Sequence, residues 1–153
     1  MRRSEKEIKD LEVIESIMKE ALECRIGLCE DNKPYIVPMN FGYKHNYLYI
    51  HSALEGKKIE ILKKNSNVCF EVDVKTEVVK AKNPCGWSMK YLSVIGFGKA
   101  SFVEDLAEKA EALNAIMEKY SGKDDYEFPE VALKKVAVIK IEIEEITGKK
   151  SKD

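Results

Sequence analysis

The sequence contains little of what marks several large protein classes. It has two histidines, four cysteines and one tryptophan in 153 residues, and 26 lysines and arginines balance 27 aspartates and glutamates. The net charge of -1 at pH 7 gives no general attraction to nucleic acid, which would need a local basic stripe. No run approaches the ~18 apolar residues of a membrane span, and no apolar segment follows the first arginines to form a secretory signal. We therefore expect a cytoplasmic protein that binds neither nucleic acid nor a membrane.

The cysteines are too scattered to indicate a metal site. Cys24 and Cys29 stand five positions apart, and Cys69 and Cys85 stand alone. No C-x2-C pair or cluster of cysteine and histidine accompanies them. We therefore predict no metal, and in a reducing compartment the cysteines should be thiols.

Hydrophobic periodicity indicates one domain, residues 1–153, in which strands and helices alternate. A chain of roughly 150 residues buries about 70% of its unfolded surface, enough for one core. Helical spacing predicts helices at residues 10–22, 56–65 and 104–120. Alternating apolar residues predict strands at 24–30, 34–43, 46–52, 68–74, 91–103 and 136–146. Because short turns join most strands, we predict a mostly β, antiparallel α+β fold or barrel that starts with a three-stranded meander.

Several single residues refine this outline. Asp10 is available as the N-cap of the first helix, because its side chain can accept a bond from a free N–H of the first turn. Pro38 lies inside a predicted strand and cannot donate to a ladder, so it indicates an edge, a bulge or a backbone that faces a ligand. In helix 104–120 we expect the core-facing residues to be Leu106, Ala110, Leu113 and Met117.

The stretch "HSALEGKK", residues 51–58, stands where a strand ends and a helix begins. Ser52 and Glu55 have the spacing of a capping box, in which each side chain bonds the other's backbone N–H. A capping box does not explain a glycine at position 56, or two lysines at the helix end whose dipole favours anions. A bound phosphate would explain both, because free backbone N–H groups, the Ser52 hydroxyl, Lys57 and Lys58 could all contact it. Both interpretations stand at this point.

Several ordered blocks of the first 103 residues resemble a known family. They are "MRRSEKEI", "RIGLCEDNKPYIVPMNFGY", "LYIHSALEGKKIEILKKNSNVCFEVD" and "CGWSMKYLSVIGFGKA". They are similar to the pyridoxamine 5'-phosphate oxidase-related flavoproteins, in particular the nitroimidazole-resistance, nitroimidazole reductase-like branch. The resemblance implies an antiparallel FMN-binding split β-barrel with flanking helices. It also implies a homodimer with FMN at the subunit interface and residues of both chains around the flavin.

The resemblance also implies roles for individual residues. The family segment similar to "HSALEGKK" holds the FMN phosphate, which points to Ser52, Lys57 and Lys58. The segment similar to "VPMNF" follows the isoalloxazine ring, which implies that Pro38, Met39 and Asn40 are cofactor-binding residues.

The strand "YLSVIGFG" resembles the family strand that reaches the flavin from the partner subunit, so Ser93 is a further candidate contact. Where the oxidase proper carries a glutamine and an arginine, this chain has Ser93 and Ile95. That difference argues against oxidation of pyridoxine phosphate. Trp87 could stack on the flavin or a planar substrate, or pack in a core or dimer interface.

His51 is the candidate catalytic residue and a candidate contact of the flavin. It precedes the phosphate segment by one residue, and histidine titrates near neutral pH, so it could donate a proton during electron transfer. The alternative is a partly buried histidine whose nitrogens bond backbone groups. His45 lies in a polar turn and is expected to be only solvated.

Taken together, these features predict an FMN-dependent oxidoreductase. A reduced donor would supply electrons, and a small molecule such as a nitroaromatic or 5-nitroimidazole compound would accept them. One alternative is a protein that binds flavin or haem without turnover, with His51 as an axial ligand. The other is a structural or regulatory dimer whose "HSALEGKK" segment is merely a capping box.

Overall fold

The computed structural model of the chain describes residues 3–151. The first two and last two residues of the predicted domain, 1–153, therefore lie outside the described residues. Within the described part, none of the helices is long and apolar enough to span a lipid bilayer.

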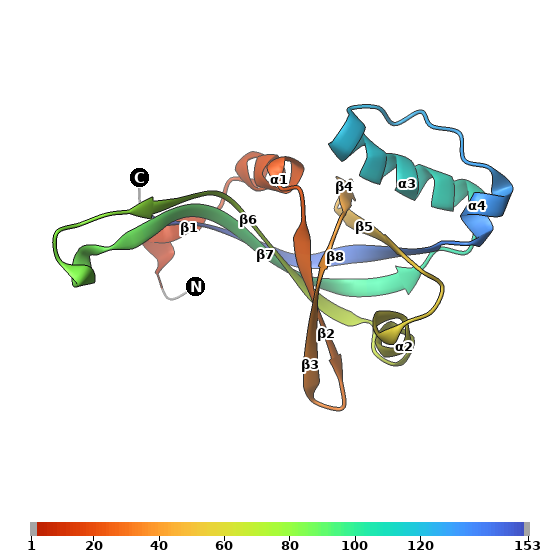
Figure 1. The fold of residues 1–153 in the computed structure, drawn as a ribbon, viewed down its shortest axis with the longest axis horizontal. Coiled ribbons are helices and arrows are strands. Elements are labelled where there is room, and N and C mark those ends of the chain that lie inside the picture. Colours follow the sequence, from red (N-terminus) through yellow and green to blue (C-terminus); the bar gives the residue numbers. More distant parts are fainter. Residues whose placement is uncertain (1–2, 152–153) are drawn as a thin grey trace.

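One antiparallel sheet organises the molecule (Figure 1). Its strand order is β3-β2-β6-β7-β8-β5-β4, and the short β1 pairs with β8. The strands are β1 (Glu7–Ile8), β2 (Cys24–Glu30), β3 (Lys33–Met39), β4 (Gly42–Lys44), β5 (Tyr47–Ser52), β6 (Asn67–Val79), β7 (Ser88–Phe102) and β8 (Ala137–Ser151). The α-helices are α1 (Leu11–Glu20), α2 (Lys57–Lys64), α3 (Leu106–Ser121) and α4 (Glu130–Lys134), with 3-10 turns at Ser4–Lys6 and Pro84–Gly86. The expected mostly β, antiparallel split barrel with flanking helices is confirmed.

The predicted meander is wrong, because the segment 34–43 forms two strands rather than one. β3 pairs with β2 at one edge of the sheet, whereas β4 pairs with β5 at the other edge. The chain crosses between them at Asn40 and Phe41, and the Phe41 side chain is completely buried. Pro38 lies on the edge strand β3, as its missing N–H predicts.

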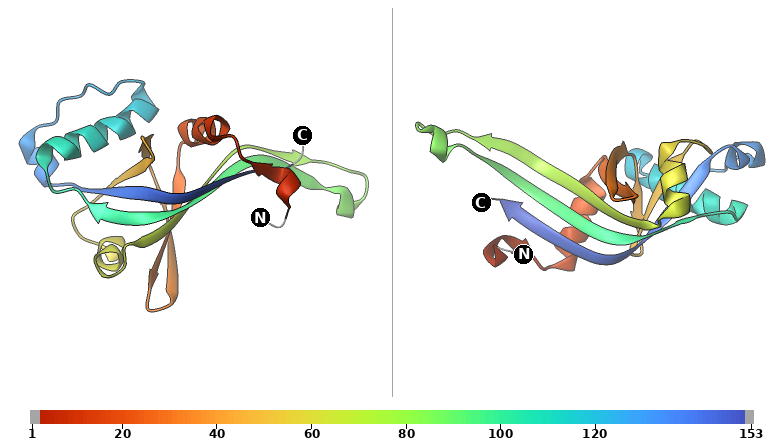
Figure 2. Two further views of the ribbon diagram at one scale, coloured as in Figure 1. Left: turned by 180° about the vertical axis from the view of Figure 1, so that it is seen from behind. Right: turned by 90° about the horizontal axis from the view of Figure 1, so that it is seen from below.

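Three strands are longer than alternation predicted. β6, β7 and β8 contain 13, 15 and 15 residues. β6 and β7 continue past Tyr91, which pairs with Ser151, the last described residue of β8. Beyond this pair they form a two-stranded projection that we call the arm, residues 75–90 (Figures 1 and 2). Its side chains are mostly exposed, so they lack the apolar alternation by which a half-buried strand is recognised.

The helices lie on both faces of the sheet, because α1 and α2 pack in the main core, whereas α3 packs on a second cluster that contains Val103, Ala112 and Val138. Asp10 caps α1 as expected, accepting a bond of 2.9 Å from the Glu12 N–H. The buried residues of α3 are Lys109, Ala112, Ala115 and Ile116, so the face predicted from Leu106, Ala110, Leu113 and Met117 is rotated from the observed one. Close approach explains the difference, because a Cβ atom on Gly42 would lie 2.6 Å from the Ala115 carbonyl carbon. Small residues therefore face β4, and the larger apolar residues lie beside them.

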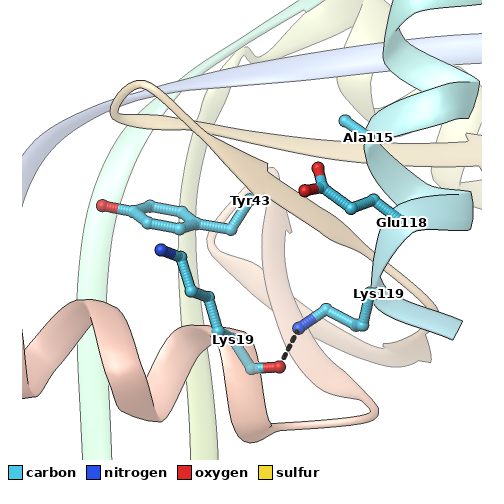
Figure 3. A pocket seen from close by; sticks show the side chains of 5 residues that line it. All are labelled: Lys19, Tyr43, Ala115, Glu118 and Lys119. Carbon is cyan, nitrogen blue, oxygen red and sulfur yellow. Dashed lines mark hydrogen bonds between the residues drawn. The ribbon is translucent and has the colours of Figure 1, made fainter. Parts of the chain in front are cut away.

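The end of α3 connects three segments that lie far apart in sequence. Lys119 Nζ donates to the carbonyls of Met18, Lys19 and Ala21 at 2.6, 3.1 and 2.8 Å, and it lies 4.1 Å from the centroid of the Phe41 ring. Figure 3 shows the lysine reaching the end of α1 beside a hollow of about 260 Å³. Burial lowers the pKa of Lys119 to about 8, whereas the carbonyls and the ring favour its charged form.

Tyr120 completes this connection. Its hydroxyl donates to the Leu22 carbonyl at 2.6 Å and accepts from the Phe41 N–H at 3.2 Å. Lys119 and Tyr120 therefore hold the crossing between β3 and β4 in place, because one contacts the ring of Phe41 and the other accepts a hydrogen bond from its backbone N–H. α3 thus determines where β3 ends.

Replacing Lys119 with methionine tests this connection. The substitution retains an apolar stem but leaves three carbonyls without their donor, so we expect a loss of about 2 to 3 kcal/mol in the free energy of unfolding. Urea denaturation at pH 7 measures it. The control Lys123→Met lies on an exposed position just past α3 and should change stability by less than about 0.5 kcal/mol. Equal midpoints for the two variants would contradict the role of Lys119.

Candidate functional site

The start of α2 is an open helix N-terminus with two lysines. Gly56 is the N-cap residue, with φ 139° and ψ 169°, and no side chain caps the helix. This backbone conformation is one that glycine adopts far more readily than other residues. The first bond that closes the helix runs from the Glu60 N–H to the Gly56 carbonyl, so the preceding N–H groups of the first turn lack helical partners. Lys57 and Lys58 therefore begin a helix whose N–H groups can receive an anion.

The capping-box interpretation of Ser52 and Glu55 is wrong. β5 extends through Ser52, which pairs with Ala137 of β8, so the serine lies in a strand rather than at the N-cap. Ser52 is 8% exposed, and its hydroxyl oxygen is buried without a hydrogen-bond partner among the described residues. A buried polar atom without a partner is costly, which makes this hydroxyl the observation that fits a ligand.

The edge strand β3 reaches the same end of the molecule as α2. Lys57 Nζ lies 4.5 Å from the centroid of the Tyr35 ring, so the first residue of α2 contacts β3. A strand rises about 3.3 Å per residue, which puts Pro38 roughly 10 Å along β3 from Tyr35. Lys57, a residue expected to bind the phosphate, and Pro38, a residue expected to contact the flavin ring, therefore lie along the same strand. Sequence reasoning missed Tyr35, because only the folded chain brings it to α2.

Pro38, Met39 and Asn40, the residues expected to contact the flavin ring, lie at the end of β3 beside a shallow hollow. Pro38 and Asn40 are exposed and Met39 is half-buried. They line a space of about 500 Å³ together with Leu22, Glu23 and Tyr120. Tyr120 thus borders this hollow while it bonds the Phe41 backbone.

His51 is exposed and lies on the opposite face of β5 from Ser52. Successive strand residues alternate between faces, so Ser52 is turned with Ile50 toward the core, whereas His51 is turned with Tyr49 toward the α3 side. Although His51 and Ser52 are neighbours in sequence, their side chains can come near a common point only at the end of the strand. A ligand that contacts both residues must therefore lie at that strand end.

The remaining candidates, Ser93 and Trp87, lie elsewhere in the chain. Ser93 is half-buried in β7 and pairs with Asp73 and Lys149. Trp87 follows the 3-10 turn at the tip of the arm and is 51% exposed. Figures 1 and 2 show this tip and α2 at opposite ends of the molecule. The single chain therefore does not bring Trp87 near Ser52, Lys57 and Lys58.

A charged cluster on the outer face of the sheet was not predicted. Arg25 lies 3.1 Å from an Asp73 carboxylate oxygen and 3.5 Å from one of Glu71. Burial and the neighbouring Asp73 raise the pKa of Glu71, and Arg25 opposes them. Sequence reasoning missed this cluster because its members lie on separate strands, β2 and β6.

The cysteines are free thiols with different surroundings. Burial raises the pKa of the Cys24 thiol to about 12, so this thiol is unreactive at neutral pH, whereas Cys85 is exposed on the arm. No group of three or more His, Cys, Asp or Glu side chains that could hold a metal ion occurs between residues 3 and 151.

Solved structures of other proteins share this fold. A candidate 5-nitroimidazole antibiotic resistance protein from Bacteroides thetaiotaomicron VPI-5482 is 40% identical, with a TM-score of 0.84 over 94% of this chain and 85% of that one. The flavocytochrome Anf3 from Azotobacter vinelandii is 20% identical, with a TM-score of 0.86 over 100% of this chain and 72% of its own. An FAD and haem binding protein from Mycobacterium smegmatis is 19% identical, with a TM-score of 0.86 over 97% and 74% of the two chains. At these lower identities the likeness shows the fold alone.

Sequence comparisons agree with the predicted family. A curated relative, uncharacterized protein RA0666 of Rhizobium meliloti (strain 1021), is 35% identical over 48 residues. This chain matches only 31% of the length of that protein. The family model of pyridoxamine 5'-phosphate oxidase matches residues 10–150, nearly the whole chain. The chain therefore belongs to the pyridoxamine 5'-phosphate oxidase family.

Proposed function

We propose that this protein is an FMN-dependent oxidoreductase whose phosphate site is the start of α2. The observation that carries the proposal is the buried Ser52 hydroxyl without a partner, next to a helix that begins with Gly56, Lys57 and Lys58. A flavin phosphate carries close to two negative charges at neutral pH. Free N–H groups, one hydroxyl and two ammonium groups match that charge and its acceptor oxygens.

The free edge of β3 supports a place for the flavin ring. Among the strands of residues 3–151, β3 has a neighbour on one side only, so alternate backbone N–H and C=O groups face outward. Pro38 removes one N–H from this edge, and Asn40 adds a side-chain amide just beyond it. Ring, linker and phosphate would then follow β3 from its end at Met39 toward Lys57, with Tyr35 between them.

The outer face of the sheet supports a homodimer. Ile36, Ile95 and Phe97 are 67, 46 and 51% exposed. Ile36 of β3 pairs with Gly27 of β2, Gly27 pairs with Cys69 of β6, and Cys69 pairs with Phe97 of β7. Directly paired residues point to the same face of a sheet, and Ile95 lies two positions from Phe97 on the same strand. Exposed apolar residues that gather on one face mark protein contacts. We infer that a second copy covers this face, with a flavin near each end of the interface.

The proposed chemistry is electron transfer from a reduced donor to a small acceptor. Bound flavin supplies the transfer itself, because it accepts a hydride equivalent and passes on two electrons with protons. His51 is exposed at the strand end next to Ser52, where a positioned histidine can donate a proton to an acceptor that enters from solvent. A nitroaromatic or 5-nitroimidazole acceptor is proposed because the structure at 40% identity is named as a candidate 5-nitroimidazole antibiotic resistance protein.

Replacing both Lys57 and Lys58 with alanine should weaken FMN binding about a hundredfold or more, because two charge-assisted contacts are lost. An FMN fluorescence titration measures the change. Lys63→Ala combined with Lys64→Ala is the matched control, since it removes the same charge from the other end of the same helix. Equal FMN affinity in the two folded double variants would exclude the start of α2 as the phosphate site.

Replacing His51 with glutamine should leave FMN affinity nearly unchanged, because glutamine keeps a polar group of similar reach. Turnover with a reduced nicotinamide donor and a nitroaromatic acceptor should fall about a hundredfold to ten-thousandfold, the usual contribution of a positioned acid or base. His45→Gln is the control for losing a histidine. Release of FMN by His51→Gln would make His51 a cofactor ligand, and unchanged turnover would remove it from the chemistry.

A further inference from the structure

We propose that a second hollow beside the proposed ring site selects acceptors by charge, and that Glu23 is the residue that determines this selection. The hollow favours planar nitro compounds that carry a cationic group and rejects those that carry an anionic group. This inference rests on the proposed FMN site, because it describes the acceptors that can reach a flavin bound there.

The second hollow adjoins the one at the end of β3. It measures about 390 Å³, and Leu22 and Glu23 line both hollows. Leu22 is 66% exposed, so the junction offers an apolar surface together with a carboxylate. A compound whose ring contacts a flavin beside Pro38 and Met39 can therefore extend past this junction into the second hollow.

The register of the sheet brings the charged cluster of the outer face to the same end of β3. Arg25 of β2 pairs with Pro38 of β3 and with Glu71 of β6. Directly paired residues point to the same face, and neighbouring strands lie about 4.8 Å apart, so Glu71 is roughly 10 Å across the sheet from Pro38. Asp73 lies two positions further along β6 on this face. The carboxylates are therefore within reach of a compound that extends from the ring site.

The carboxylates of this cluster outnumber its cations. The Arg25 guanidinium lies 3.1 Å from Asp73 and 3.5 Å from Glu71. Glu23 approaches the same guanidinium at 3.5 Å. One positive charge thus faces three carboxylates, and two negative charges are left over when all three are ionised. Of the described residues that line the second hollow, Arg25 is the only one with a positive charge.

Other charges near the hollow do not remove this excess. Glu20 also lines it, but Lys75 lies 3.5 Å from Glu20, so these two charges cancel. Burial and the neighbouring Asp73 raise the pKa of Glu71, although Arg25 opposes them. A cationic group in the hollow would offset the negative charge, whereas an anionic group would add to the repulsion.

Glu23 is the carboxylate best placed to act on an acceptor. It lines both hollows, whereas Asp73 lines only the second. It stands just before β2, at the border of the sheet, and its side chain is 63% exposed. An acceptor can therefore pass it without entering the apolar face that we propose a second copy covers. Because water screens so exposed a charge, we expect the rates for acceptors of charge +1 and -1 to differ by about tenfold.

Reoxidation of the reduced flavin tests this selection without an electron donor. The FMN-loaded protein is photoreduced without oxygen and mixed at pH 7 with 4-nitrobenzylamine, 4-nitrobenzyl alcohol or 4-nitrobenzoate. The nitro group takes two electrons from the reduced flavin and two protons, loses one oxygen atom as water and becomes a nitroso group. Each rate, per bound FMN, is divided by the rate with free reduced riboflavin, which removes intrinsic differences between the three acceptors.

The charge ratio is the normalised rate with the amine divided by that with the carboxylate. It should be about ten for the unmodified protein and should fall as salt is added. Glu23→Gln should lower it about threefold, and Glu23→Lys should bring it below one. Glu127→Gln, at an exposed position after α3, is the control and should keep the original ratio. The same charge ratio in Glu23→Gln and the unmodified protein would overturn the proposal.

FMN binding separates this inference from the proposed function. A protein that binds no FMN removes the proposed function, and the acceptor selection is removed with it. Bound FMN that the three acceptors reoxidise equally, or not at all, leaves the FMN site standing and rejects the selection by Glu23.

Discussion

Burial of Phe41 is the constraint on which the rest of the structure depends. The side chain lies fully in the core, its ring faces the Lys119 ammonium group, and its N–H donates to Tyr120. The chain therefore cannot continue as one strand from Lys33 to Lys44. It forms two hairpins instead, and these close opposite edges of the sheet.

This division creates the candidate site. Because β4 pairs with β5 and not with β3, no other described strand pairs with the outer edge of β3, which lies next to the start of α2. β5 then delivers Ser52 to the strand end just before Gly56. The interactions of Lys119 and Tyr120 with α1 and Phe41 lie far from the lysines of α2, but they determine where β3 ends. The packing of α3 and the geometry of the site are therefore coupled through one buried aromatic residue.

Local chemistry allowed much of the fold to be predicted from sequence. The Asp10 cap, the edge position of Pro38 and most strands follow from hydrogen-bonding capacity and alternation. The break at Phe41 did not follow, because an apolar residue inside an apolar run gives no local sign that the chain changes edges. The rotated face of α3 was missed for a related reason, since the close approach of Gly42 to Ala115 is a tertiary contact. The predicted strands stopped short of the arm, because its exposed strands lack the alternation of apolar and polar residues.

The site was predictable in its parts rather than in its assembly. Gly56, Lys57 and Lys58 can be recognised from residue type at a helix start. The Tyr35 contact and the isolation of the Ser52 hydroxyl appear only when strands and helix meet. Ser52 also shows how a sequence motif can mislead, because its spacing to Glu55 fits a capping box although the serine belongs to β5.

The central claim is that the start of α2 binds the phosphate of a flavin. FMN and riboflavin share the ring and differ by that phosphate, so parallel equilibrium titrations of the purified protein with the two compounds isolate its contribution. The account predicts one FMN per chain and an affinity for FMN about a hundredfold or more above that for riboflavin. Equal affinities would contradict it, because the ring would then bind without any contribution from Ser52, Lys57, Lys58 or the free N–H groups of α2.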